Sequence, residues 1–463
     1  MSWIDNILFN LPEVAAPTQK KLSFKEKLKW TGLILILFYA LGLFPLFGLG
    51  QNALQQFEFL SIVLGAHFGS VLSLGIGPIV TASIVLQLLN GSGIFKFDLT
   101  SHDGKRKFQG LQKLLTIGFT VFEASIYVLM GGLAPPSELA GTGVYTSLQF
   151  LLITQLTIGG ILIVFMDEVV SKWGFGSGVS LFIAANVSQS IFVQAFSPLP
   201  SPTNPGVSAG AIPALFQSLA AGDPVTAGLK VAALASTVLV FVMAVYAQAM
   251  KIEIPLSFGR VRGHGIRWPL NFIYTSNIPV ILVAALMANV QLWAHLLQNW
   301  GHPFLGTFVG NTPASGLVAW IAHTNIVGLI IKGSFTWSSL LHSLVYLLVM
   351  LGGSVIFSIF WVQTAGMDAK TQAKNIMSSG LQIPGFRKDQ RVLERILDRY
   401  IWPLTVMGGI TVGILAGLAD LSGALSRGTG ILLAVMIVYR LYEEIARQHM
   451  MDMHPMLRRF MEA

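Results

Sequence analysis

Apolar stretches long enough to cross a lipid bilayer recur along this chain. A membrane-spanning helix needs about 20 mainly apolar residues. Only 11% of the residues are charged, whereas soluble domains carry about 25%. We therefore expect an all-α protein that spans the membrane ten times. The expected spans are 31–48, 76–89, 111–133, 147–166, 178–196, 229–249, 271–293, 339–362, 401–419 and 429–446.

The basic residues lie mainly on one side of these spans. They precede the first span and follow the second, fourth, sixth, eighth and tenth, whereas the opposite connections carry only Lys230, Lys332 and Arg427. Cytoplasmic connections carry the excess of Lys and Arg in membrane proteins. We therefore expect both termini in the cytoplasm, and the net charge of +8 is explained mainly by topology.

The second span is interrupted where it ought to begin. The stretch SVLSLGIGPIVT (70–81) contains Gly75, Gly77 and Pro78 inside an apolar run of more than thirty residues, which is too long for one span. Glycine permits unusual backbone conformations, and proline is tolerated at the first turn of a helix. The preceding residues therefore form either a separate short element or the outer end of a long, kinked helix.

Five spans lie on each side of the connection 197–228. Because the number per half is odd, the second half enters the membrane from the other side, and the halves would be inverted repeats around a central path. This architecture is shared with many transporters, so an inverted-repeat secondary transporter is an alternative function.

Few ionisable groups lie inside the expected spans. Glu123 is the one carboxylate well within a span, and such groups are functional candidates because they are costly in lipid. A gate or proton site and a simple helix-packing hydrogen bond both remain open for it. A single carboxylate makes a proton relay, and hence a transporter, less favoured. The chain also lacks cysteine, nucleophile–base pairs and metal or phosphate motifs, so we expect no catalytic residue, metal or cofactor.

Several motifs, in order along the chain, resemble the SecY family of protein-conducting channels. They are KLSFKEKLKWTG, GIGPIVTASIVLQLLNGSG, DEVVSKWGFGSGVSLFIAANVSQ, IEIPLSFGRVRG, YTSNIPVIL and GTGILLAVMIVYRLYEE. The resemblance extends from about residue 10 to the C-terminus and is closer to the archaeal and eukaryotic α-subunits than to the bacterial ones. Only the two long outer connections differ.

The resemblance implies an hourglass-shaped pore between the two halves, with a short plug helix at 57–67 and an aliphatic ring at its waist. It also implies a lateral gate between the second and seventh spans. The implied ring residues are Ile76, Val80, Val179, Ile183, Ile281 and Leu433, and the implied polar gate residues are Thr81, Glu123, Asn277 and Gln87. Without the resemblance, lipid-facing or ordinary packing positions would be the favoured explanation of the aliphatic residues.

The resemblance further implies ribosome contacts at Arg260, Arg262, Arg387 and Lys388, although positive-inside topology alone could account for their charge. The implied partners are a SecE/γ subunit, a small Secβ or SecG-like subunit, the ribosome with a nascent chain that carries a signal sequence, the signal recognition particle receptor pathway, and the lipid bilayer of the cell membrane. The expected segments are an amphipathic N-terminal segment (1–30, with an interfacial helix over 1–20), two halves (31–196 and 229–447), the outer loop 197–228, cytoplasmic loops 251–269 and 363–400, and a tail (448–463).

Overall fold

Ten long helices of the described chain match the ten expected spans one for one. The computed structural model describes residues 10–19, 22–52, 66–91, 102–200, 207–258, 265–275, 277–309, 312–378, 381–382, 389–426 and 428–453. The ten helices are α2 (Phe24–Gly42), α4 (Gly77–Gly91), α5 (His102–Leu129), α6 (Gly143–Trp173), α7 (Gly178–Phe196), α9 (Pro224–Ala249), α10 (Ile278–Asn299), α13 (Trp337–Thr364), α15 (Gln390–Leu421) and α16 (Gly428–Met453). Six of them (α6, α7, α9, α10, α13 and α15) are long and apolar enough to cross a membrane by themselves.

Short elements fill the connections. They are β1 (Gln51–Asn52), β2 (Leu133–Ala134), η2 (Ser137–Leu139), α8 (Ala211–Ala220), β3 (Lys251–Phe258), β4 (Gly265–Asn271), β5 (Phe308–Val309), β6 (Thr312–Pro313), α11 (Gly316–Ile321), α12 (Ile326–Ile331), α14 (Ala369–Ser378) and β7 (Leu381–Gln382). The expected outer loop 197–228 therefore contains a helix, α8, and the first turn of α9.

Two helices begin at residues that differ from the expected starts of their spans, and local structure explains both differences. Helix α2 begins seven residues before position 31 because Ser23 and Glu26 form a reciprocal capping box, which supplies partners for unpaired backbone N–H groups. Helix α10 begins at Ile278 rather than at 271, because β4 extends to Asn271 and Pro279 occupies the first turn, where its missing N–H is tolerated.

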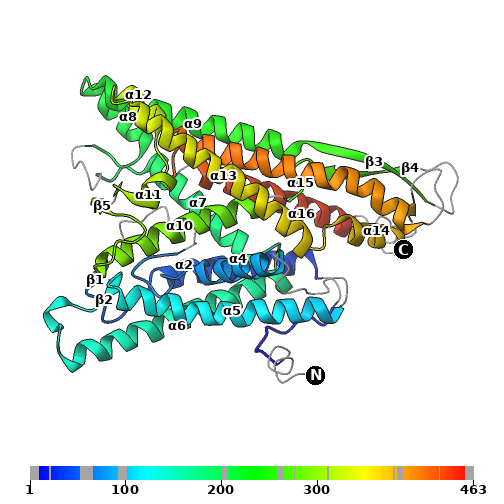
Figure 1. Ribbon diagram of the computed structural model, residues 1–463, viewed down its shortest axis with the longest axis horizontal. Helices are drawn as coiled ribbons and strands as arrows, with labels where there is room; N and C mark the ends of the chain where they lie inside the picture. Colours follow the sequence, from blue (N-terminus) through cyan, green and yellow to red (C-terminus); the bar gives the residue numbers. More distant parts are fainter. Residues whose placement is uncertain are drawn as a thin grey trace.

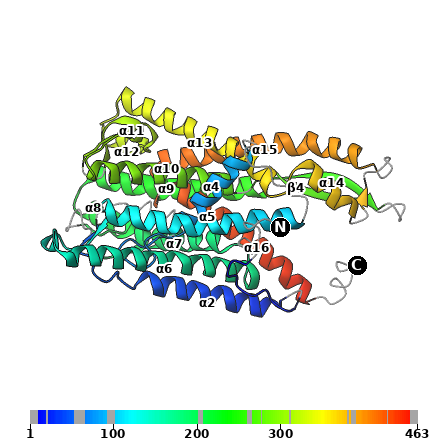
Figure 2. The same ribbon diagram turned by 60° about the horizontal axis from the view of Figure 1, so that its bottom comes forward.

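The helices form two groups that correspond to the two halves of the chain. Helices α2, α4, α5 and α6 of the first half lie below, and α9, α13 and α15 of the second half lie above, with α7, α10 and α16 between them (Figure 1). One continuous apolar core joins both groups. The beginning of α2 and the end of α16 meet at one end of the molecule, where the rings of Phe24 and His449 are 5.4 Å apart (Figure 2).

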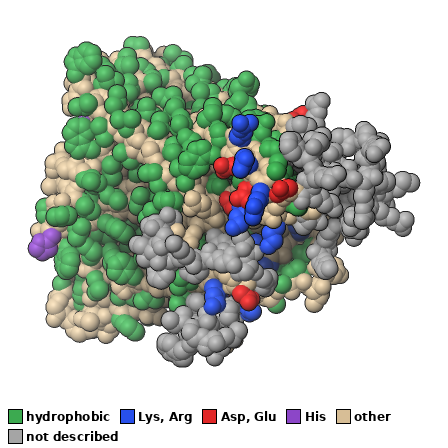
Figure 3. All heavy atoms as spheres, turned by 45° about the vertical axis from the view of Figure 1, so that its right-hand side comes forward, with side chains coloured by type: hydrophobic (Ala, Val, Ile, Leu, Met, Phe, Trp, Pro, Cys, Tyr) green, Lys and Arg blue, Asp and Glu red, His purple; other side chains and the backbone are tan. Residues whose placement is uncertain are grey.

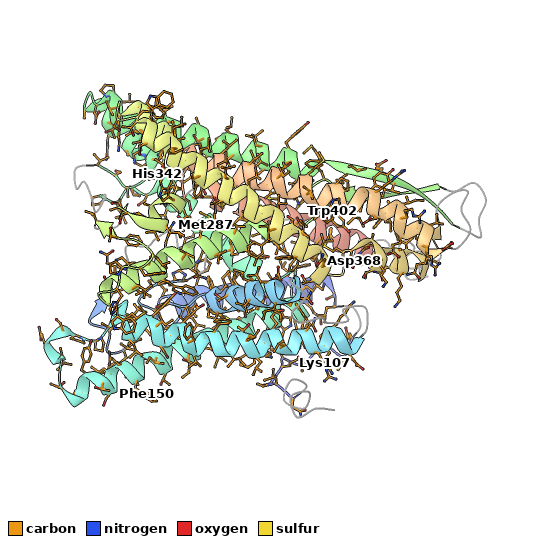
Figure 4. All side chains as sticks on the ribbon, viewed as in Figure 1. Lys107, Phe150, Met287, His342, Asp368 and Trp402 are labelled. Atoms are coloured by element: carbon orange, nitrogen blue, oxygen red, sulfur yellow. The ribbon has the colours of Figure 1, made fainter. Side chains whose placement is uncertain are left out.

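Basic side chains gather at this same end, which we call the basic end; it carries β3, β4 and α14 (Figure 1). In the space-filling view, Lys and Arg lie beside a surface that is otherwise mostly hydrophobic (Figure 3). Lys107 and Asp368, from opposite halves, lie toward the basic end, whereas Phe150 and His342 lie toward the other end (Figure 4). This distribution agrees with the charge asymmetry of the sequence.

A small antiparallel sheet stands in place of the expected loop 251–269. Strand β3 pairs along its length with β4, and its last two residues pair with β7. The sequence KIEIPLSF alternates apolar and polar residues with the period of two that is typical of a strand. This alternation lies in a connection that was expected to be a loop, so the strand was not predicted.

The N-terminal segment departs from its expected conformation. Residues 1–20 were expected to form an amphipathic helix, and this expectation is wrong for residues 10–19, which are irregular. Two prolines in this short stretch remove helical N–H donors. The segment instead crosses α6: the Val14 N–H donates to Glu168 Oε2 at 2.9 Å, and Lys172 Nζ donates to the Val14 carbonyl at 2.6 Å.

Candidate functional site

The six residues of the expected aliphatic ring come from four helices and pack in one apolar core. Five of them are buried, and Val179 is half-buried against the same core. Helix α4 contacts α10, α10 contacts α16, and α16 contacts α7, so the ring positions from both halves are brought together. They are Ile76 and Val80 at the start of α4, Val179 and Ile183 in α7, Ile281 in α10, and Leu433 in α16.

A cavity of about 660 Å³ lies beside these residues. Its lining includes three of the ring residues, Val80, Val179 and Ile281, together with the basic side chains of Lys105 and Arg440. Its walls come from α4, α5, α7, α10, α13 and α16, that is, from both halves. The cavity, called the vestibule below, therefore has both aliphatic and polar walls.

Tight turns seat the beginning of α4 against α6. The Val71 N–H donates to the Phe44 carbonyl at 3.0 Å, and the next residues continue as turns up to Gly77. A Cβ placed on Gly159 of α6 would lie 1.9 Å from the Val71 carbonyl oxygen. Only glycine permits this approach, so Gly159 holds the segment that carries Ile76. The sequence pattern pointed to the glycines of the turn itself, Gly75 and Gly77, but not to Gly159 on the facing helix α6.

A buried hydrogen-bonded chain joins the two halves between α4 and α10. Thr81 Oγ1 donates to Glu123 Oε1 at 2.9 Å, and Asn289 Nδ2 donates to Thr81 Oγ1 at 3.2 Å. All three side chains are at least nine-tenths buried. Thr81 and Glu123 belong to the first half and Asn289 to the second, so the last bond crosses the seam between the halves.

The expected gate residue Asn277 lies at a different level of the structure from this chain of hydrogen bonds. Asn277 precedes α10 and lines the vestibule, twelve residues and about 18 Å of helix before Asn289. Gln87 is also buried and lines the same vestibule. The sequence signal for Asn289 was an amide in the middle of an apolar helix, since polar groups inside a membrane almost always face other helices.

The two basic connections share one folded platform at the basic end. Strand β3, helix α14 and the first half of α15 form a separate apolar cluster that includes Ile254, Ala373 and Leu397. Pairing of Phe258 with Leu381 joins the connection after α9 to the connection after α13. The four expected ribosome-contact residues (Arg260, Arg262, Arg387 and Lys388) lie outside the described residues, as does the expected plug 57–67 apart from Ala66 and His67.

Comparison with known proteins decides the family. The SecY family model matches residues 70–442. The protein translocase subunit SecY of Methanothermobacter thermautotrophicus is 48% identical over 455 residues, which cover 97% of this chain and 96% of the relative. The corresponding protein of Pyrococcus horikoshii is 43% identical, with 97% and 96% covered.

The chain belongs to the SecY family.

Solved structures agree with this assignment. A structure described as that of a protein conducting channel superposes with a TM-score of 0.82 at 42% identity, covering 97% of this chain and 98% of the other. Sec61 in the canine ribosome–channel complex superposes with a TM-score of 0.79 at 41% identity, covering 97% and 98%. Membership of the SecY family confirms the expected helical membrane fold, and the comparisons give no support to the secondary transporter alternative.

Proposed function

We propose that this chain forms the channel through which unfolded secretory polypeptides cross the cell membrane, and that it releases transmembrane segments sideways between α4 and α10. The observation that carries the proposal is the vestibule, which both halves line and whose walls include Val80, Val179 and Ile281 of the proposed ring. A polypeptide would enter from the basic end, which we assign to the cytoplasm together with both termini.

The chemistry of the ring suits a seal around a moving chain. Branched apolar side chains offer a polypeptide no hydrogen bonds on which to pause, and a narrow apolar constriction excludes water and ions. The chain would act as a passage without catalysis, so the driving force would come from its partners. Those partners would be a SecE/γ subunit and a small Secβ or SecG-like subunit, with substrates delivered through the signal recognition particle receptor pathway.

The lateral opening would follow the polar contact across the seam. An interhelical hydrogen bond in a membrane is worth about 0.6–2 kcal/mol. Such a bond keeps α4 and α10 together at rest but is weak enough for an apolar signal segment to displace it. Glu123 serves here as the fixed acceptor that orients Thr81 toward Asn289.

Crosslinking of a stalled secretory chain tests the pore. The chain contains no cysteine, so single cysteines at positions 76, 80, 183 and 281 are unique sites. We expect each to crosslink to the nascent chain, because all four lie at the proposed ring. A cysteine at Phe150, which is 72% exposed on the outer face of α6, is the matched control and should not react. Reaction at the control position with none at the ring would overturn the pore assignment.

Ribosome binding would use the two connections that the basic platform joins. The β3–β7 pairing joins the two connections that carry the four basic residues, so one docked particle could contact both. Ribosomal RNA phosphates bind such residues with a strong salt dependence. The ribosome-bound Sec61 channel is a structural relative of this chain.

Charge reversal at one of the four basic residues tests this docking. We expect Arg387→Glu to weaken ribosome binding about three- to tenfold at low salt and by less at high salt, because screened phosphate contacts contribute less. Lys370→Glu, at an exposed position of α14, is the control of equal charge change. Binding should be measured at two salt concentrations. Equal weakening by both variants would show that only net charge matters and would contradict a specific docking site.

A further inference from the structure

A buried carboxylate at the end opposite the basic end has no part in the function described so far. Asp420 lies in the last turn of α15 and is only 2% exposed. Its Oδ1 accepts from the Thr429 N–H at 2.7 Å, and its Oδ2 accepts from Tyr346 Oη at 2.5 Å and from Thr429 Oγ1. Three donors from α13 and α16 thus converge on one side chain of α15.

The position of Thr429 makes this cluster an anchor for a helix. Thr429 is in the first turn of α16, where unpaired N–H groups and the helix dipole favour a negative charge. Helices α15 and α16 are also in direct contact there, because a Cβ on Gly428 would lie 2.1 Å from the Ala419 carbonyl carbon. Buried carboxylates are costly unless several donors satisfy them, so these bonds fix a definite position of α16.

The connection between α15 and α16 is held from two further helices. The Ser426 N–H donates to Gln194 Oε1 of α7 at 2.8 Å, and the Leu425 N–H donates to Thr237 Oγ1 of α9 at 3.0 Å. Leu433 is one helical turn after Thr429 and therefore lies on the same face of α16. The cluster and the ring position are thus connected by a single helical turn.

We infer that Asp420 is a positioning residue, whose carboxylate holds the first turn of α16 against α13 and α15 and so places Leu433 at the aliphatic ring. The first part of this statement rests on the contacts of Asp420. The second part rests on the proposed pore. The two parts can be tested separately.

Disulfide formation measures the position of α16 directly. A Cβ on Gly430 would lie 3.6 Å from Val187 Cγ1 of α7, so cysteines at 187 and 430 are within reach of each other. A reference pair at 228 and 331 joins α9 and α12, where the Gly228 Cβ would lie 3.7 Å from Ile331 Cγ2. In Asp420→Ala we expect the rate for 187/430 to fall about tenfold, because the buried charged hydrogen bonds are lost, while the rate for 228/331 stays the same.

Milder variants keep the test valid if Asp420→Ala folds poorly. Tyr346→Phe removes one donor, and Asp420→Asn keeps an acceptor for the Thr429 N–H, so each should lower the 187/430 rate less than alanine does. Asp223→Ala removes another carboxylate that caps a helix, α9, but is exposed, and it should change neither rate. Unchanged 187/430 crosslinking in Asp420→Ala, or an equal fall for both pairs, would overturn the inference.

Ion flux through proteoliposomes tests the second part. We expect the leak of the closed channel to rise in the variants whose 187/430 rate falls, and in the same order. A fall in crosslinking with no change in leak would support the anchoring by Asp420 and count against Leu433 as a sealing residue. The failure of the anchor and the failure of the pore assignment are therefore distinguishable.

Discussion

Gly159→Ala is expected to loosen the closed channel. The new Cβ would lie 1.9 Å from the Val71 carbonyl oxygen, a backbone atom, so rotation of a side chain cannot relieve the clash. The turn at Val71 must therefore shift, and with it Ile76. Overpacking of this kind costs about 1–3 kcal/mol, which we expect to see as faster thermal inactivation in detergent together with a higher ion leak.

Gly352→Ala is the matched control for this change. Gly352 lies inside α13, and a Cβ there meets no atom within 4 Å. Because alanine favours helices over glycine, this variant should be as stable as the parent or slightly more so, with no added leak. Normal stability and a normal leak in Gly159→Ala would show that the contact with Val71 does not hold the pore segment.

Asn289→Leu is expected to let weaker signal sequences open the lateral gate. The substitution removes the side-chain hydrogen bond from α10 to Thr81 but leaves the bond between Thr81 and Glu123 in place. Lipid tails are as apolar as leucine, so the new side chain gains no hydrophobic stabilisation of the closed seam. The closed state should lose about 0.6–1.7 kcal/mol, or about 3- to 20-fold in the closed-to-open ratio.

A translocation assay with signal sequences of graded hydrophobicity measures this effect. Asn277→Leu is the matched control, since Asn277 lies at the vestibule rather than at the Thr81 contact. We expect the hydrophobicity threshold to fall in Asn289→Leu and to change less in Asn277→Leu. An equal shift in both variants would mean that polarity along α10, and not this hydrogen bond, controls the gate.

The differences between expectation and structure have definable physical causes. Helix α7 occupies 178–196 as expected, because a long apolar stretch in lipid has to form a helix that satisfies its own backbone. The cytoplasmic sheet was missed, although strand alternation in 251–258 could have indicated it. Its pairing with 381–382 could not be foreseen, because more than one hundred residues separate the partners.

The candidate site, like the fold, was predicted from the sequence only in part. The motifs around Ile76 and Val80 were sufficient to place them at a shared apolar centre, and the structure buries both. The contact of Asn289 with Thr81 depends on how far α10 extends past α4, and therefore on where α10 starts after β4 and how it packs. Neither the start of α10 nor its packing against α4 can be read from the local sequence.

By itself the sequence determined the number of spans, the end at which the basic residues gather and the family, because these follow from hydropathy, charge and motif order along one dimension. The tertiary structure decided which side chains meet: Gly159 with Val71, Asn289 with Thr81, and Asp420 with Thr429. The physical reason is that such contacts depend on helix register and crossing, which are set by packing between segments far apart in the chain. The proposed gate and the anchor of α16 both depend on these contacts.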